Sequence, residues 1–185
     1  MTAGRSLALH PDAFLESERL YYRPIKPEDL DWLVEMRTPE NVARYLGGSR
    51  LQNREALTER MKFYMECHDK YGIGLSVMAL KSTDEKIGTS GLQPLEDTGE
   101  IEVGYNMSER FWGQGYGTEC ALAWLRFGFD KLGLERVVAI ADPDNIGSWR
   151  IMEKCGMTLE KREEHYGIEC VFYAVSRVTF FNLQQ

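Results

Sequence analysis

Three glycines stand at alternate positions in the segment ERFWGQGYGTECA, residues 109–121. Gly113, Gly115 and Gly117 lie directly before a run with helical periodicity, which predicts a helix over residues 118–132. Glycine loses more backbone entropy on folding than any other residue, so this cluster indicates that the backbone itself has a role here. The loop constrains both the fold and the ligand more than any other segment of the chain.

A glycine-rich turn between a strand and a helix builds an anion site. The first backbone N–H groups of a helix have no internal partners and lie at the positive end of the helix dipole. Glycines remove Cβ atoms, so a phosphate can approach these groups closely. A tight turn without a ligand is the alternative, but three glycines before Thr118 and Glu119 favour a phosphate cradle.

The motifs around this loop narrow the choice of phosphate. The chain has no GxxxxGK[ST] segment, which excludes a nucleoside-triphosphate P-loop. Asp142 ends the next predicted strand at about the offset where a dinucleotide site places its ribose-binding acid. The glycine spacing, however, is G-x-G-x-G rather than G-x-G-x-x-G, and the loop follows predicted antiparallel strands. A nicotinamide-dependent oxidoreductase therefore remains only as an alternative.

The composition fits one soluble domain. The chain has 185 residues, of which 43% are hydrophobic and 28% charged. Its net charge of −7 argues against nucleic acid as a partner, because the phosphates would be repelled. The opening MTAGRSLALHPDAF has no apolar run long enough for a signal peptide or membrane span, so we expect a cytoplasmic protein without a membrane partner. We assign residues 1–16 to an N-terminal extension and residues 17–185 to the domain.

The periodicity of the chain predicts a mixed α/β domain. The order is strand, two helices, three strands, helix, strand, helix and two closing strands. Three consecutive strands before the glycine loop indicate an antiparallel meander. The predicted strands cover residues 19–25, 74–81, 85–95, 99–108, 136–144, 157–166 and 169–181, and the predicted helices cover residues 26–46, 53–71, 118–132 and 145–156.

The cysteines indicate neither a metal site nor a disulfide framework. Cys67, Cys120, Cys155 and Cys170 form no CxxC pair, and the three histidines are scattered. We expect reduced, mostly structural thiols and no metal.

Three segments resemble one known family. WGQGYGT after IEVGYNMSERF resembles the acetyl-CoA loop of the GNAT N-acetyltransferase superfamily, whose pattern is R/Q-x-x-G-x-G/A. Residues 17–46 resemble the opening of the branch that contains the ribosomal-protein N-terminal (Rim-type) acetyltransferases. Residues 144–157 are similar to that branch's N-x-x-S…K-x-G-hydrophobic segment. Together the three segments cover most of residues 17–180 in the family's order.

The first position of the glycine motif departs from the general pattern. The register that uses Gly115 and Gly117 puts Trp112 where the family has Arg or Gln. A shift by two residues would put Arg110 there instead. We prefer the first register because it places Thr118 at the start of the helix.

The resemblance implies a fold and a cofactor. A single mixed, mostly antiparallel sheet would be flanked by helices, and its central strands VGYNM and RVVAIA would splay to admit the pantetheine arm of acetyl-CoA. The free strand edge at Tyr105 and Met107 would bind that arm as an added strand would. Asn145 and Ser148 match family positions near the arm and the sulfur, although Asn145 could simply cap a helix. The expected cofactor-binding residues are Tyr105, Met107, Gln114, Gly115, Gly117, Thr118 and Asn145.

The resemblance also implies candidates for the chemistry. Amines are mostly protonated near pH 7, so transfer to an amine should need a base. The family pattern places a glutamate at Glu102, and Glu100 on the same strand face is its competitor. Many superfamily members have a tyrosine to protonate the leaving thiolate where this chain has Met152, so Ser148 is the best hydroxyl nearby. Glu102 and Ser148 are the predicted catalytic residues.

The acceptor implied by the resemblance is a primary amine. We favour a protein or peptide N-terminus over a small-molecule amine such as a polyamine or an aminoglycoside. A non-catalytic acyl-CoA sensor on the same fold is a second alternative; Met152 favours it, whereas Glu102 and Ser148 disfavour it. A homodimer is compatible with the sequence.

Overall fold

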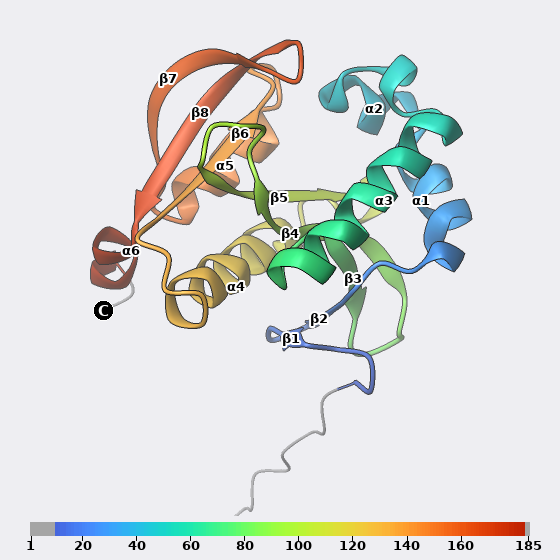
Figure 1. Ribbon diagram of the computed structural model, residues 1–185, viewed down its shortest axis with the longest axis horizontal. Helices are drawn as coiled ribbons and strands as arrows, with labels where there is room; N and C mark the ends of the chain where they lie inside the picture. The colour runs from blue at the N-terminus through green and yellow to red at the C-terminus, as the bar shows by residue number, and fades with distance from the viewer. Residues whose placement is uncertain (1–9, 184–185) are drawn as a thin grey trace, which may run out of the picture.

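The computed structural model describes residues 10–183, in which eight strands form one sheet (Figure 1). The strand order is β1-β2-β3-β4-β5-β6-β8-β7. The strands are β1 (Leu15–Glu16), β2 (Leu20–Arg23), β3 (Ser76–Leu80), β4 (Lys86–Pro94), β5 (Ile101–Met107), β6 (Arg136–Ala141), β7 (Thr158–His165) and β8 (Ile168–Ser176). The α-helices are α1 (Leu30–Arg37), α2 (Glu40–Ala43), α3 (Arg54–Tyr71), α4 (Tyr116–Asp130), α5 (Ile146–Lys154) and α6 (Arg177–Leu183). Short 3-10 turns η1 (Pro27–Asp29), η2 (Arg44–Leu46), η3 (Ser49–Leu51) and η4 (Glu109–Phe111) complete the elements.

One pair of neighbouring strands differs from the others. The described strands pair antiparallel except β5 and β6, which run parallel and meet only at Glu102 and Val138. The later residues of β5, up to Met107, therefore have no strand partner on the β6 side. The prediction of a mixed, mostly antiparallel sheet with splayed central strands is confirmed, as is the meander of β3, β4 and β5.

Helices cover both faces of the sheet because consecutive strand residues point to opposite sides. On β3, Val77 packs with α1 and α3, where it contacts the cluster that includes Leu57. Its neighbour Met78 packs into the larger core with α4, α5 and α6, which includes Trp124 and Phe180. The molecule thus has three layers, with the sheet in the middle (Figure 1).

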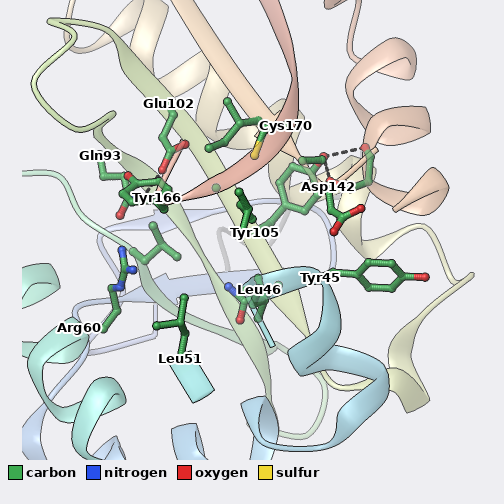
Figure 2. Close-up of a pocket in the computed structure, with 18 of the residues that line it drawn as sticks. Tyr45, Leu46, Leu51, Arg60, Gln93, Glu102, Tyr105, Asp142, Tyr166 and Cys170 are labelled. Carbon is green, nitrogen blue, oxygen red and sulfur yellow. Dashed lines mark hydrogen bonds between the residues drawn. The ribbon is translucent and has the colours of Figure 1, made fainter. Parts of the chain in front are cut away.

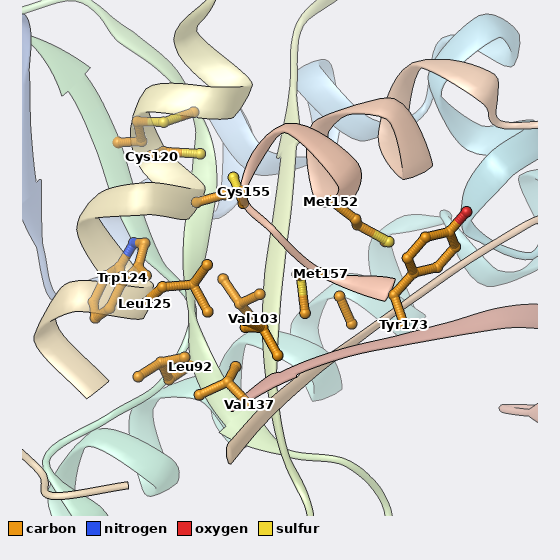
Figure 3. Packing of buried hydrophobic residues seen from close by; sticks show 14 of the residues in the cluster. Leu92, Val103, Cys120, Trp124, Leu125, Val137, Met152, Cys155, Met157 and Tyr173 are labelled. Atoms are coloured by element: carbon orange, nitrogen blue, oxygen red, sulfur yellow. The ribbon is translucent and has the colours of Figure 1, made fainter. Parts of the chain in front are cut away.

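Helix α4 contributes Cys120, Trp124 and Leu125 to the larger core (Figure 3). Trp124 and Leu125 are completely buried against the sheet. The indole Nε1 of Trp124 donates a hydrogen bond to Ser90 Oγ at 3.0 Å, so the one polar atom of that side chain is satisfied. The packing fixes α4, and with it the glycine loop at its start, on the central strands.

The end of the chain was predicted wrongly. The strand expected over residues 169–181 ends at Ser176, and α6 occupies Arg177–Leu183. The Ser176 hydroxyl accepts a hydrogen bond from the Thr179 backbone N–H at 3.1 Å, which is a helix-capping contact. Phe180 is buried 5.2 Å from the ring of Phe129. The β-branched and aromatic residues here serve a helix whose buried face packs on α4.

The residues just before β2 contact the rest of the domain. Residues 1–9 of the predicted extension lie outside the described residues. Within the remainder, Leu15 and Glu16 pair with β2, and the ring of Phe14 lies 5.7 Å from that of Trp124. The boundary between extension and domain stays a prediction. No helix of the described residues is long and apolar enough to cross a membrane.

Replacing Trp124 by alanine should lower the free energy of unfolding by about 3–5 kcal/mol, because it leaves a large cavity beside the sheet. Urea denaturation followed by circular dichroism measures this. The control is Val178→Ala on the exposed face of α6, which should change the free energy by no more than about 0.5 kcal/mol. Equal effects of the two substitutions would contradict the assignment of Trp124 to the core.

Candidate active site

A cavity of about 150 Å³ lies where β5 and β6 separate (Figure 2). Its wall comes from α1, the η2–η3 segment, α3, strands β4 to β6, α5 and the turn between β7 and β8. Both predicted catalytic residues, Glu102 and Ser148, line this cavity. Segments from nearly the whole chain meet at this gap in the sheet.

Glu102 is a buried carboxylic acid in the cavity wall. Only 5% of its surface is exposed, and Gln93, its partner across β4 and β5, donates a side-chain hydrogen bond to it. Burial raises the pKa of Glu102 to about 7, although the Gln93 hydrogen bond and the charge of Arg60 oppose this rise. The group can therefore take up and release a proton near neutral pH.

Glu100, the predicted competitor, lies elsewhere. Its carboxylate forms an ion pair with Arg136 at 3.2 Å, and it is not among the residues that line the cavity. The alternation along β5 holds as predicted, because Val103 joins the core below the sheet while Glu102 faces the other side. Glu102 therefore lies in the cavity wall, whereas Glu100 lies in an ion pair outside it.

The side chain of Tyr105 reaches α5. Its hydroxyl donates to the backbone carbonyl of Ser148 at 2.9 Å and accepts from Ser148 Oγ at 3.3 Å. Burial raises the pKa of Tyr105, so the phenol stays protonated. The sequence reasoning used only the backbone of Tyr105 and missed this hydroxyl pair. The alternation along β5, which places Tyr105 on the same side as Val103, was the signal for it.

The backbone edge of β5 has the expected direction. The Ser108 N–H donates to the Ile87 carbonyl at 3.0 Å, toward β4. Because backbone groups alternate in direction along a strand, those of Tyr105 and Met107 point to the open side. The Met107 carbonyl accepts a hydrogen bond there from the Trp112 indole at 2.9 Å. Trp112 therefore ties the loop to the end of β5.

The glycine loop ends at a helix that begins earlier than predicted. Helix α4 starts at Tyr116, with Gly115 as its N-cap, so Thr118 is the third helical residue rather than the first. The Glu119 N–H is the first to bond back, to the Gly115 carbonyl at 3.0 Å. The N–H groups from Gly115 to Thr118 precede it and have no partner within the helix.

Glycine is needed in the loop for two different physical reasons. Gly113 and Gly115 have φ angles of +72° and +83°, which side-chain-bearing residues rarely adopt. Gly117 is an ordinary helical residue, but a Cβ there would lie 2.5 Å from Ile151 Cδ1 on α5. The first two shape the turn, and the third lets α4 and α5 approach each other.

Arg19, just before β2, holds the loop from outside. Its guanidinium donates to the Gln114 carbonyl at 3.0 Å and to the Glu119 carboxylate at 2.7 Å, and it lies 4.2 Å from the centre of the Tyr116 ring. The Ser17 hydroxyl donates to the same carboxylate at 2.6 Å. Nothing in the local sequence pattern links positions 100 residues apart, so sequence reasoning missed these contacts.

Asn145 caps a helix. Its Oδ1 accepts a hydrogen bond from the Ser148 N–H at 3.2 Å at the start of α5, and it does not line the cavity. This capping role was the simpler of the two expectations for Asn145. Through it, the position of Ser148 beside Tyr105 is fixed.

The thiols of the four cysteines are free and buried, as predicted. Burial raises the pKa of Cys155 to about 12 and raises that of Cys120, so neither is a ready nucleophile. Residues 10–183 contain no group of three or more metal-ligating side chains placed to hold a metal ion.

Comparisons with known proteins identify the family to which the chain belongs. The family model described as "Acetyltransferase (GNAT) domain" matches residues 19–158. YoaA of Bacillus subtilis, described as an uncharacterized N-acetyltransferase, is 30% identical over 151 residues, which are 79% of this chain and 83% of that protein. A solved acetyltransferase of Agrobacterium tumefaciens is 26% identical, with a TM-score of 0.77 over 87% of this chain and 92% of that one.

A third comparison concerns the Rim-type branch. The structure of RimL, a ribosomal alpha-N-protein acetyltransferase in complex with coenzyme A, has a TM-score of 0.71 at 19% identity, over 86% of this chain and 95% of that one. At this identity the likeness shows a shared fold. The family match and the relatives define the class of this protein as acyltransferases that transfer acetyl from acetyl-CoA to an amine. The chain belongs to the GNAT acetyltransferase family.

Proposed function

We propose that this enzyme transfers acetyl directly to a primary amine held beside Glu102. We favour a protein or peptide N-terminus over a small-molecule amine as the acceptor. The observation that carries the proposal is a buried carboxyl with a pKa of about 7 in the gap between β5 and β6. The hydroxyls of Tyr105 and Ser148 lie on the other side of the same strand. The carboxyl and the two hydroxyls line one cavity, which supports a base and a proton donor acting on the same substrate.

The glycine loop and the β5 edge fit acetyl-CoA. The N–H groups from Gly115 to Thr118 are the free hydrogen-bond donors that a pyrophosphate needs. The absence of a Cβ at Gly117 lets the loop lie close to α5. The Met107 carbonyl already accepts from Trp112, so the backbone edge at Tyr105 and the Met107 N–H are the groups that suit the amides of a pantetheine arm. Gln114 presents its carbonyl to Arg19, so its share in the cradle is the backbone N–H. Acetyl-CoA supplies the activated acyl group.

The chain's own residues would handle the protons. Glu102 accepts the proton that the amine loses as its nitrogen bonds to the acyl carbon, either directly or through a water. As the bond from that carbon to sulfur breaks, Tyr105 gives the departing sulfur its hydroxyl proton. The Ser148 hydroxyl donates a hydrogen bond to the resulting phenolate along their 3.3 Å contact, and a proton from solvent then restores the Tyr105 hydroxyl. In this scheme Tyr105, which the sequence reasoning treated as a backbone ligand, takes the role first given to Ser148.

Acetyl-CoA should raise the melting temperature and NAD should not. Ligand at about 100 times its Kd adds about 2.7 kcal/mol to the stability of the folded state. Differential scanning fluorimetry measures the shift. Stabilisation without release of coenzyme A in the presence of amines would favour the acyl-CoA sensor, and no stabilisation would remove acetyl-CoA as the ligand.

Gly115→Ala should weaken acetyl-CoA binding at least about fivefold, because left-handed backbone costs alanine about 1 kcal/mol and the cradle turn would distort. Titration calorimetry gives the Kd. Gly133→Ala is the matched control, since Gly133 also has a positive φ, with open space around it, at the far end of α4. It should lose similar stability but keep its Kd; equal Kd losses would contradict the cradle.

Glu102→Gln should lower kcat about 100-fold or more while leaving the Kd of acetyl-CoA within about twofold. The base works only when ionised, so wild-type kcat/KM should rise as the pH passes upward through about 7. The variant should lose that inflection and keep only the rise due to the amine. Glu100→Gln is the control and should keep the profile; an unchanged rate in Glu102→Gln would remove Glu102 as the base.

A further inference from the structure

Two arginines line the same cavity as Glu102. Arg37 comes from α1 and Arg60 from α3. Figure 2 shows Arg60 directed from its helix toward Tyr166, Gln93 and Glu102. Its guanidinium lies 5.2 Å from the centre of the Tyr166 ring. The cavity wall thus carries positive charge from two separate helices.

Arg37 is a buried charge without an opposite partner. It is only 5% exposed, and its one side-chain hydrogen bond is to the hydroxyl of buried Tyr64 at 3.2 Å. Its Nε has no hydrogen-bond partner. Within residues 10–183, no carboxylate lies within 4.0 Å of the charged nitrogens of Arg37 or Arg60. An unpaired buried charge is costly, so this arrangement calls for an anion from outside the chain.

A second orphaned atom lies in the same wall. Gln52 is 5% exposed, and its Nε2 donates to the Leu46 carbonyl at 2.5 Å, while its Oε1 has no partner. Arg37 offers an unused donor and Gln52 an unused acceptor. A carboxylate of a bound molecule would accept from Arg37, and an N–H of the same molecule would donate to Gln52.

The signs of charge in the cavity disfavour one kind of acceptor. Glu102 and Asp142 supply acidic groups, and Arg37 and Arg60 supply basic ones. A polyamine or aminoglycoside carries several positive charges and would be repelled by two arginines. A molecule with an amine at one end and an acid at the other matches both signs.

We propose that the acceptor amine carries a carboxylate, which Arg37 binds while the amine lies at Glu102. The inference rests on the proposed function, since it names the class of amine that the same cavity takes. A guanidinium pairs with a carboxylate in a planar, two-bond geometry, and the free Nε edge of Arg37 is available for it. Free amino acids, and peptides with an acidic residue near the N-terminus, belong to this class.

The test is a competition among isosteric acceptors. The wild-type enzyme and acetyl-CoA are mixed with equal amounts of Ala-Asp amide, Ala-Asn amide, 4-aminobutyrate, 4-aminobutanamide and spermidine, and mass spectrometry measures each acetylated product. In the favoured pair, the carboxylate member should be acetylated about tenfold faster than its carboxamide, because a lost charged contact leaves Arg37 unpaired. Carboxamides or spermidine acetylated as fast as the acids would overturn the proposal.

Arg37→Met tests the residue itself. The variant should lose the preference for the carboxylate member, whereas Arg54→Met, on the exposed side of α3, should keep it. Circular dichroism and acetyl-CoA affinity show whether Arg37→Met folds. Should it not fold, the wild-type competition still decides the matter. Acetyl-CoA binding with no product from any amine would instead refute the proposed function, which distinguishes the two failures.

Discussion

The parallel contact between β5 and β6 is the constraint on which the rest of the structure depends. Because the two strands meet only at Glu102 and Val138, the sheet opens beyond that pair. Residues of β5 on both faces then border one cavity. Glu102 reaches it from the side of α3, and Tyr105 reaches it from the side of α5. A fully paired sheet would keep these two side chains on opposite surfaces with no space common to both.

The electrostatics of the glycine loop follow from a second long-range arrangement. An acid in the first turn of a helix is favourable for the helix but repels an anion at the same place. Glu119 occupies that position in α4. Burial would raise the pKa of Glu119, but hydrogen bonds from Ser17 and Arg19 outweigh it and lower the pKa. Arg19 therefore offsets the charge that Glu119 brings next to the proposed phosphate cradle.

The elements of the fold could be predicted from local pattern, because most of them have one clearly apolar face. The prediction of the last strand was wrong at its end because the aromatic and β-branched residues there also fit a helix. The Ser176 cap and the contact of Phe180 with Phe129 stabilise the helix. The early start of α4 was not predicted because glycines at the start of a helix are also typical of loops. In the site, the family resemblance implied Glu102 and Ser148, whereas Gln93 and Arg37 come from distant segments and have no local signal.

The sequence by itself determined the family, through the glycine spacing and the segment from Asn145 to Ser148, and it determined the order of most strands and helices. These are local properties, set by backbone conformation and by side-chain periodicity within a few residues. Only the tertiary structure decided which polar groups are buried. Burial gives Glu102 a pKa near neutrality, brings the Tyr105 phenol to Ser148 and leaves Arg37 without a counter-charge. Desolvation depends on every segment that surrounds a group, so no window of sequence contains it.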